Sequence, residues 1–263
     1  MLILDPELIS AFSSDKPLFP QLMALRGEVF RELENRRTQR VILNGKPYFL
    51  KQHYGVGYRE IFKNVFQGRL PVISAKNEWL ALKRLAELNI PAPVIAGYGW
   101  EGVNPATRRS FLLTHEIPAH VSLEDFCKDW KSTPPPFQLK QHLIKCVARM
   151  ARTLHEHGVN HRDFYLCHFL LDLASLQPQK TPILSLIDLH RANVRRQVPT
   201  RWLVKDLAGL YFSSKDAGLT RRDLLRFMKA YRNKPLKHIL NNETHFWQRI
   251  KERGDRLYQR HTP

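Results

Sequence analysis

The chain has 263 residues, enough for one large domain or for two lobes around a cleft, and its hydrophobic (43%) and charged (25%) fractions argue against disorder. Three cysteines without paired spacing argue against a disulfide framework and against a cysteine-based zinc site. The formal net charge of +18 favours anionic partners. The alternative is a solvated basic face without any partner.

The N-terminal part is expected to be rich in strands. Alternation of apolar and polar residues predicts strands at about 28–34, 39–43 and 47–52, with an Asn-Gly turn signal between the last two. Helical spacing then predicts a helix at 75–90 that stops before Pro91.

Helices are expected to predominate after about residue 115. A buried strand at 110–117 precedes a helix at 122–130 and a long amphipathic helix at 137–158 that Gly158 ends. Short apolar strands are expected at 168–173 and 182–189, and the chain after Val198 has a helical pattern.

Residues 161–171 read "HRDFYLCHFLL", and the first half of this stretch is typical of the catalytic loop of a phosphotransferase. Phosphoryl transfer from ATP needs a cation on the phosphates, a carboxylate on magnesium, a carboxylate that orients the acceptor hydroxyl, and a cover over the triphosphate. The sequence offers a candidate for each of these parts, in the order found in kinases.

On the ATP side, Lys51 ends the third strand, and Glu78 follows 27 residues later on the helix, where it could hold the lysine as an ion pair. Asp163, in the same triplet as Arg162, is the candidate for the acceptor hydroxyl, and Asp188 is the candidate metal ligand 25 residues later. Each residue alone is a weak signal, but the ordered set favours a kinase-like fold.

The expected cover over the triphosphate departs from the usual pattern. The turn between the first two strands, "ENRRT", contains no glycine, so Arg36 and Arg37 could supply charge to the phosphates; equally, they could be plain arginines at the tip of a hairpin. Backbone groups of Glu116 and Ile117 are the expected contacts to adenine in the cleft.

His168 stands where such loops usually carry Asn. Magnesium prefers oxygen ligands, so we expect Asp188 alone to anchor the metal from the protein side. His168 would instead donate a hydrogen bond to a phosphate oxygen or a carboxylate. The alternative is a structural histidine that fills the loop and bonds backbone groups.

The segment after Asp188 indicates the class of acceptor. Only 18 residues separate it from Asp206, in "KDLAGLYFS", which we expect to be bonded back to the catalytic loop. No "APE" ending follows, and little room is left for a segment that binds a peptide, so a sugar or lipid hydroxyl is favoured over a protein substrate.

Several motifs together resemble the lipopolysaccharide core heptose(I) kinase family, from about Ala24 to Tyr258: "RGEVFRELENRRT", "GVGYREIFKN", "VSLEDF", "GVNHRDFYLCHFLL", "IDLHRA" and "GLTRRDLLRF". The resemblance implies ATP-dependent phosphorylation of the first heptose of the inner core, at the cytoplasmic side of the inner membrane. It also implies that Asp163 is the catalytic aspartate, Lys51 the phosphate-binding lysine and Asp188 the magnesium ligand. The histidine in "CHF" is shared by the family.

We therefore expect an α+β, protein-kinase-like, two-lobed fold, with a strand-rich N-lobe (1–115) and a helical C-lobe (116–263).

Residues 195–263 hold 17 basic and 6 acidic side chains, a surface suited to docking on the inner-core glycolipid and an anionic membrane surface. An acidic carrier protein is a further candidate partner, and no nucleic acid is expected. We expect a peripheral protein of the cytoplasmic face, because no apolar run approaches the roughly 18 residues of a membrane span and the first twenty residues resemble no signal peptide.

Two alternatives stay open at this point. One is a related kinase that acts on the Kdo sugar of the same glycolipid or on a small molecule. The other is a basic nucleic-acid-associated binding protein with a kinase-like fold, for which a charge of +18 is equally natural.

Overall fold

The computed structural model describes residues 1–55, 57–58, 74–104, 106–177 and 180–261. The motif at 55–64 therefore lies mostly outside the described residues. The chain divides into two compact units, one made of residues 1–83 and 93–117 and the other of residues 84–92 and 118–263. The division into kinase lobes at residues 115 and 116 stays a prediction.

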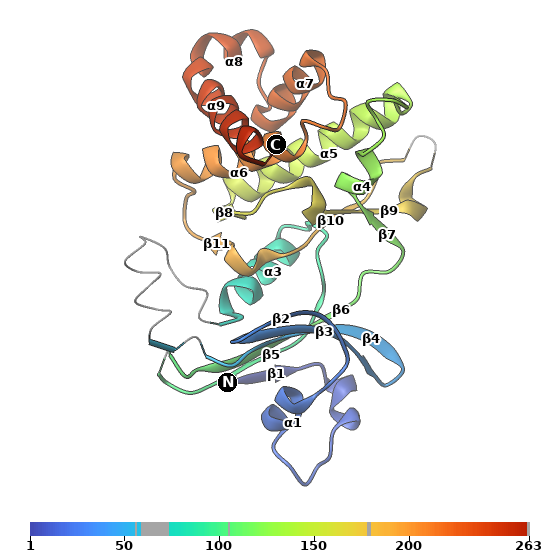
Figure 1. Ribbon diagram of the computed structural model, residues 1–263, viewed down its shortest axis with the longest axis vertical. Coiled ribbons are helices and arrows are strands. Elements are labelled where there is room, and N and C mark those ends of the chain that lie inside the picture. Colours follow the sequence, from blue (N-terminus) through green and yellow to red (C-terminus); the bar gives the residue numbers. More distant parts are fainter. Residues whose placement is uncertain (56, 59–73, 105, 178–179, 262–263) are drawn as a thin grey trace. The chain divides into compact units, whose positions relative to one another are not determined.

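The first unit is built on a six-stranded antiparallel sheet with the order β1-β5-β6-β4-β3-β2 (Figure 1). Its strands are β1 (Leu2–Leu4), β2 (Glu28–Leu33), β3 (Arg36–Leu43), β4 (Lys46–His53), β5 (Ile95–Glu101) and β6 (Arg109–His115). The three strands expected at the N-terminus and the strand expected at 110–117 are confirmed as β2, β3, β4 and β6. Strand β3 begins at residue 36, three residues earlier than expected, because a turn of two residues, 34 and 35, joins β2 to β3.

Sequence reasoning missed β1 and β5. In β5, "IAGYGWE", two glycines dilute the strand pattern. The structure explains them by close packing: a Cβ on Gly97 would lie 2.8 Å from Cδ1 of Leu4, and one on Gly99 would lie 2.6 Å from Cε1 of Phe111. The glycines let β1 and the Phe111 ring approach the backbone of β5.

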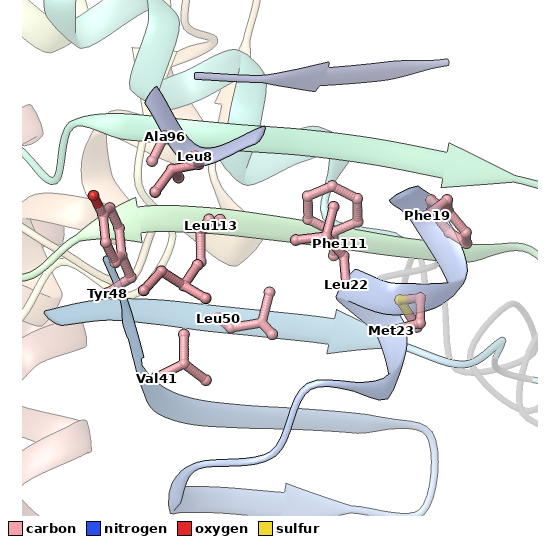
Figure 2. Packing of buried hydrophobic residues seen from close by; sticks show 11 residues of the cluster. Leu8, Phe19, Leu22, Met23, Val41, Tyr48, Leu50, Ala96, Phe111 and Leu113 are labelled. Atoms are coloured by element: carbon pink, nitrogen blue, oxygen red, sulfur yellow. The ribbon is translucent and has the colours of Figure 1, made fainter. Parts of the chain in front are cut away.

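One face of this sheet is covered by the N-terminal segments η1, a 3-10 helix (Pro6–Ala11), and α1 (Leu18–Ala24) (Figure 2). Buried side chains from both segments and from the strands form a single apolar cluster, of which Leu8, Phe19, Leu22, Leu50, Phe111 and Leu113 are members. Side chains alternate between the faces of a strand, so Lys51 lies on the face opposite its neighbour Leu50. The apolar core covers one face of the sheet, and the charged side chain of Lys51 lies on the other face.

Helix α3 (Lys76–Glu87) confirms the helix expected at 75–90 but ends before Pro91 is reached. Asn89 adopts the left-handed conformation (φ 53°), and the amide of Ile90 donates to the carbonyl of Leu85. This is the hydrogen-bond pattern of a helix end capped by a left-handed residue.

The second unit is mainly helical, with α4 (Leu123–Cys127), α5 (Phe137–Glu156), α6 (Thr200–Ser213), α7 (Arg221–Arg232), α8 (Leu236–Asn242) and α9 (Thr244–His261) (Figure 1). The long helix ends as expected, since Gly158 follows α5 with φ 81°, where a Cβ would collide with the carbonyl oxygen of Arg195. None of the described helices is long and apolar enough to cross a membrane.

Two small antiparallel sheets complete the second unit. Strands β7 (His120–Ser122), β9 (Phe169–Asp172) and β10 (Leu184–Leu186) form one, in the order β10-β9-β7, and β8 (Val159–Asn160) pairs with β11 (Asn193–Val194) in the other. The strands expected at 168–173 and 182–189 are thus present in shortened form. Residues 189–191 instead form a 3-10 turn, η4.

Candidate active site

The first unit holds the ion pair expected between Lys51 and Glu78. Nζ of Lys51 on β4 lies 2.5 Å from Oε1 of Glu78 on α3. The glutamate side chain is only 6% exposed and the lysine side chain 24% exposed, so water screens the pair poorly. Oε2 of Glu78 is buried and has no hydrogen-bond partner among the described residues. The pairing is confirmed, and a role in binding ATP stays a prediction.

Glu116, expected near adenine, is held by Arg40 in a two-pronged ion pair. Nε and Nη2 of Arg40 each lie 3.0 Å from a carboxylate oxygen of Glu116. The backbone amide of Glu116 donates to the carbonyl of Pro47 at 3.3 Å. A contact of Glu116 with adenine would therefore use its carbonyl oxygen, and the role of Ile117 stays a prediction.

The arginines expected to cover the triphosphate are the first residues of β3. Arg37 donates to Glu32 on the neighbouring strand through Nε, at 2.9 Å, and this hydrogen bond raises the pKa of Arg37. Arg36 lies opposite Leu33 of β2 and His53 of β4 in the sheet register. The paired charge of Arg37 fits the interpretation as a hairpin arginine, and phosphate contacts of either residue stay predictions.

In the second unit, the loop that carries the His-Arg-Asp triplet is clamped to α6. Asp206, which is fully buried, accepts the backbone amides of His161 at 2.7 Å and Arg162 at 2.8 Å. The expected bond from the "KDLAGLYFS" helix back to this loop is therefore confirmed. Ring Nε2 of His161 lies 2.9 Å from the carbonyl of Ile187, to which it donates. Burial lowers the pKa of His161, so this ring is neutral.

Asp163 is oriented by Arg191, whose Nη1 donates to both carboxylate oxygens at 2.8 and 3.2 Å. The Asp163 side chain is 13% exposed. Each carboxylate oxygen can accept more than one hydrogen bond, so the arginine leaves acceptor capacity for a substrate hydroxyl. The result is a carboxylate held in one orientation at the end of the clamped loop.

His168 joins the loop to Asp188. Its Nδ1 lies 2.6 Å from the carbonyl of Asp163, and because a carbonyl only accepts, Nδ1 carries the hydrogen. Its Nε2 lies 3.5 Å from Oδ2 of Asp188, and its ring stacks on that of His161 at a centroid distance of 5.6 Å. The hydrogen bond to the backbone carbonyl fits the interpretation of His168 as a structural histidine. The short distance to Asp188 fits the interpretation of His168 as an electrostatic partner of a carboxylate.

Asp188 and Arg162 have left-handed backbones, with φ values of 59° and 75°. For residues other than glycine such conformations cost on the order of 1–3 kcal/mol, and they concentrate at active sites. His190 holds the Asp188 carboxylate through Nδ1 at 2.5 Å. Hydrogen bonds thus hold Arg162, an expected catalytic residue, and Asp188, the expected metal ligand, in these conformations.

The donors fit magnesium as the nucleotide's metal. Among the described residues, no cluster of three or more His, Cys, Asp or Glu could hold a metal by itself. Magnesium usually takes one or two carboxylates and completes its shell with phosphates and water. The single carboxylate of Asp188 meets that requirement.

The model of the lipopolysaccharide kinase (Kdo/WaaP) family matches residues 20–231. The chain belongs to this family. It is 46% identical over 245 residues to the lipopolysaccharide core heptose(I) kinase WaaP of Escherichia coli strain K12. This match covers 93% of this chain and 92% of the relative. It is also 46% identical over 242 residues to the enzyme of that name from Pseudomonas aeruginosa strain PAO1, covering 92% and 90%.

A solved structure of WaaP in complex with acyl carrier protein matches this Kdo/WaaP family member with a TM-score of 0.83 and 40% identity, over 98% of this chain and 99% of that one. The expected α+β, kinase-like fold and the expected family are therefore confirmed.

Sequence reasoning missed Arg191 as the partner of Asp163 in the candidate active site. The residue stands in the motif "IDLHRA", yet no periodicity separates it from the other arginines of the chain. It reaches Asp163 because β11 pairs with β8, with Asn193 opposite Asn160, on either side of the two loops. Only this pairing could have revealed it.

We predict that Lys51 and Glu78 are energetically coupled. In a double-mutant cycle with Lys51→Met and Glu78→Gln, urea unfolding should give a coupling free energy of about 1–3 kcal/mol, because each single change leaves a largely buried charge without its partner. The control is Arg84–Glu87, a pair on the same helix with side chains 34% and 57% exposed, which should couple by less than about 0.5 kcal/mol. Equal coupling in both pairs would contradict the special role of Lys51 and Glu78.

Proposed function

We propose that this chain is an ATP-dependent lipopolysaccharide core heptose(I) kinase, which transfers the γ-phosphoryl group of ATP to a heptose hydroxyl of the inner core. The observation that carries the proposal is the Asp163 carboxylate, which is oriented by Arg191 on a loop clamped by Asp206 and joined through His168 to Asp188. Family membership adds the class of reaction, and the similarity to two heptose(I) kinases favours heptose over Kdo as the acceptor.

In the proposed transfer, Asp163 accepts a hydrogen bond from the heptose hydroxyl and holds its oxygen in line with the γ-phosphorus. A bond forms between this oxygen and phosphorus while the bond from phosphorus to the bridging oxygen of ADP breaks, and the hydroxyl proton passes to Asp163. Arg191 keeps the carboxylate in the required orientation.

Different residues would bind the phosphates and the adenine of the nucleotide. Lys51, fixed by Glu78, would bind the phosphates, and the backbone at Glu116 and Ile117 would bind adenine. Arg36 and Arg37 are further candidates for the phosphates, and Arg37 also donates a hydrogen bond to Glu32. Magnesium, when bound at Asp188, would neutralise charge on the phosphates.

His168 would act as a positioning residue. Its Nδ1–H bond to the carbonyl of Asp163 fixes the loop, and its other nitrogen faces the Asp188 carboxylate. This arrangement supports the hypothesis that the ring orients the two carboxylates and does not ligate magnesium.

The proposed acceptor is membrane-bound, so we place the protein peripherally at the cytoplasmic face of the inner membrane. Helices α7 to α9 and the turn between α7 and α8 carry exposed basic side chains suited to an anionic surface, namely Arg221, Arg222, Lys229, Lys234, Lys237, Arg249, Arg253, Arg256 and Arg260. The apolar side of α7, including Leu224, Phe227 and Met228, faces a cavity instead.

This cavity supports an acyl carrier protein as a further partner. It has a volume of about 510 Å³, lies within the helical unit, and is lined mainly by apolar side chains, among them Leu143, Val147, Leu207, Leu210, Phe227 and Ile239. Apolar cavities exclude water and accept apolar ligands. We propose that an acidic carrier protein binds the basic helices and that its acyl chain enters this cavity.

The proposed function predicts that Asp163→Asn retains binding of ATP but loses phosphoryl transfer by about 10²-fold or more, because the amide orients and deprotonates the hydroxyl poorly. The assay incubates the protein with ATP and inner-core glycolipid and locates the phosphate by mass spectrometry. Asp216→Asn is the matched control: Asp216 is an exposed aspartate paired with Lys131, and its replacement should leave turnover unchanged. Turnover of Asp163→Asn near that of the wild type would refute the assignment.

For His168, replacement by Ala should lower kcat about tenfold or more, because the loop loses its bond between Asp163 and the ring. His168→Asn should recover part of the loss by restoring a donor to that carbonyl. The magnesium concentration for half-maximal activity should stay the same in both variants. A large rise in this concentration for His168→Ala would show that the ring ligates the metal.

For the carrier protein, acylated carrier should raise the thermal unfolding midpoint more than the same carrier without an acyl chain, because a ligand that binds only the folded state stabilises it. Replacement of Leu210 by Trp, which fills the cavity from one wall, should remove the difference between the two carriers. A shift that does not depend on the acyl chain would place the carrier on the surface alone.

A further inference from the structure

A group of cations surrounds Trp202, next to the catalytic loop. The charged ends of four side chains lie within 6 Å of its ring centroid: Arg162 at 4.8 Å, Arg201 at 5.4 Å, Lys205 at 5.6 Å and Arg195 at 5.9 Å. One aromatic ring attracts cations only weakly, by about 0.5–2 kcal/mol for each contact, which does not offset the repulsion among four of them.

The nearby acids Asp163 and Asp206 offset these cations only in part. Asp163 accepts from Arg191, and Asp206 uses one oxygen for each of two backbone amides. Among the described residues, Arg162 and Arg195 enter no ion pair, and the Nε groups of both are buried without a hydrogen-bond acceptor. Buried donors in native proteins are almost always satisfied, so these two groups indicate a missing acceptor.

Burial and the neighbouring arginines disfavour positive charge at this place. Burial, followed by repulsion from Arg191, lowers the pKa of Lys205 to about 8. Burial, Arg191 and Arg195 lower the pKa of Arg162 as well. Arg201 and Lys205 also lie in the first two turns of α6, where the helix dipole disfavours cations. Folding alone gives no reason to gather these charges.

The backbone fixes the arginines in place. The amide of Arg195 donates to the carbonyl of Gly158 at 2.9 Å, next to the pairing of β11 with β8. Arg162 is held by Asp206 in its left-handed conformation, directly before Asp163. Both side chains are therefore positioned before any ligand arrives, as in a binding site.

We propose that Arg162, Arg195 and Lys205 form an anion subsite that binds an oxyanion of the acceptor glycolipid, next to the sugar whose hydroxyl meets Asp163. The proposal rests on the proposed function. The acceptor is favoured over ATP because Arg162 adjoins the residue assigned to the acceptor hydroxyl, and Lys205 interacts electrostatically with that same Asp163. The guanidinium fork suits a carboxylate or a phosphate, and the carboxylate of an acidic inner-core sugar and a phosphate of the same glycolipid are the two sources.

The test is a binding cycle that varies both the protein and the acceptor, measured by calorimetry without ATP. The proteins are the wild type, Arg195→Gln, Lys205→Gln and Arg196→Gln, the last an exposed neighbour that loses the same charge. The acceptors are the detergent-solubilised inner-core glycolipid, the same glycolipid with its sugar carboxylates reduced to alcohols, and the same glycolipid after removal of its phosphates. Thermal unfolding of each variant verifies that it is folded.

We expect Arg195→Gln and Lys205→Gln each to raise the Kd of the intact glycolipid about tenfold, the loss of one or two charge-assisted hydrogen bonds. Reduction of the carboxylates should raise the wild-type Kd by a similar factor, and the variants should then show no further loss. The Kd for ATP should not change in any variant, and Arg196→Gln should bind every acceptor like the wild type.

Additive effects of variant and acceptor, or equal losses in Arg196→Gln, would overturn the subsite. If the variants lose their effect on the phosphate-free acceptor instead, the subsite stands and its ligand is a phosphate. Because the binding measurement needs no turnover, it tests the subsite separately from the proposed function. If the chain binds the glycolipid through this subsite but transfers no phosphate, only the proposed function is contradicted.

Discussion

The loop that carries the His-Arg-Asp triplet is held in place by the fully buried carboxylate of Asp206. Its two oxygens accept the consecutive amides of His161 and Arg162, and Nε2 of His155 on α5 lies 3.4 Å from Oδ2. His155 in turn bonds the hydroxyl of Tyr231 on α7 through Nδ1 at 2.9 Å. One buried polar network thus links three helices to the loop, and it imposes the left-handed backbone of Arg162 that presents Asp163.

A comparable network supports the charged residue of the first unit. Gln39 and Gln52 are buried on neighbouring strands, bond each other at 3.1 Å, and donate to the carbonyls of Leu25, Leu22 and Met23 at the end of α1. They fasten the N-terminal helix to one face of the sheet. Lys51, between Leu50 and Gln52 in the strand, faces the other way and meets Glu78. In each unit, buried amides or carboxylates fix the backbone so that one charged side chain has a defined position.

Much of this arrangement follows from local patterns in the sequence. Alternation indicated β2, β3 and β4, helical spacing indicated α3 and α5, and the order of Lys51, Glu78, Asp163 and Asp188 indicated the class of chemistry. These features depend on neighbours in the chain. The pairing of Lys51 with Glu78 was also predictable, because a strand end followed by an amphipathic helix leaves few positions for an inward-facing acid.

What remained hidden depends on contacts between distant segments. β5 was missed because its glycines serve packing against Leu4 and Phe111, which no local pattern reveals. Arg191 and Arg195 were missed because they reach the loop through the pairing of β8 with β11, a sheet with only two residues in each strand. Trp202 was missed because it approaches the loop from α6, a segment distant in the sequence. The hydrogen bond that His168 donates to the Asp163 carbonyl could not be predicted either, since the sequence shows only a histidine where an asparagine is usual.

The claim that Asp206 holds the loop is tested most directly by amide hydrogen exchange of His161 and Arg162 in the wild type and in Asp206→Asn. An asparagine side chain has one oxygen in place of two and turns its NH₂ group toward one of the amides, which leaves a buried donor unsatisfied at a cost of about 1–3 kcal/mol. Both amides should exchange about ten- to a hundredfold faster in the variant, while amides in the sheet of the first unit should keep their rates. Unchanged exchange at His161 and Arg162 would contradict the claim that Asp206 holds the loop.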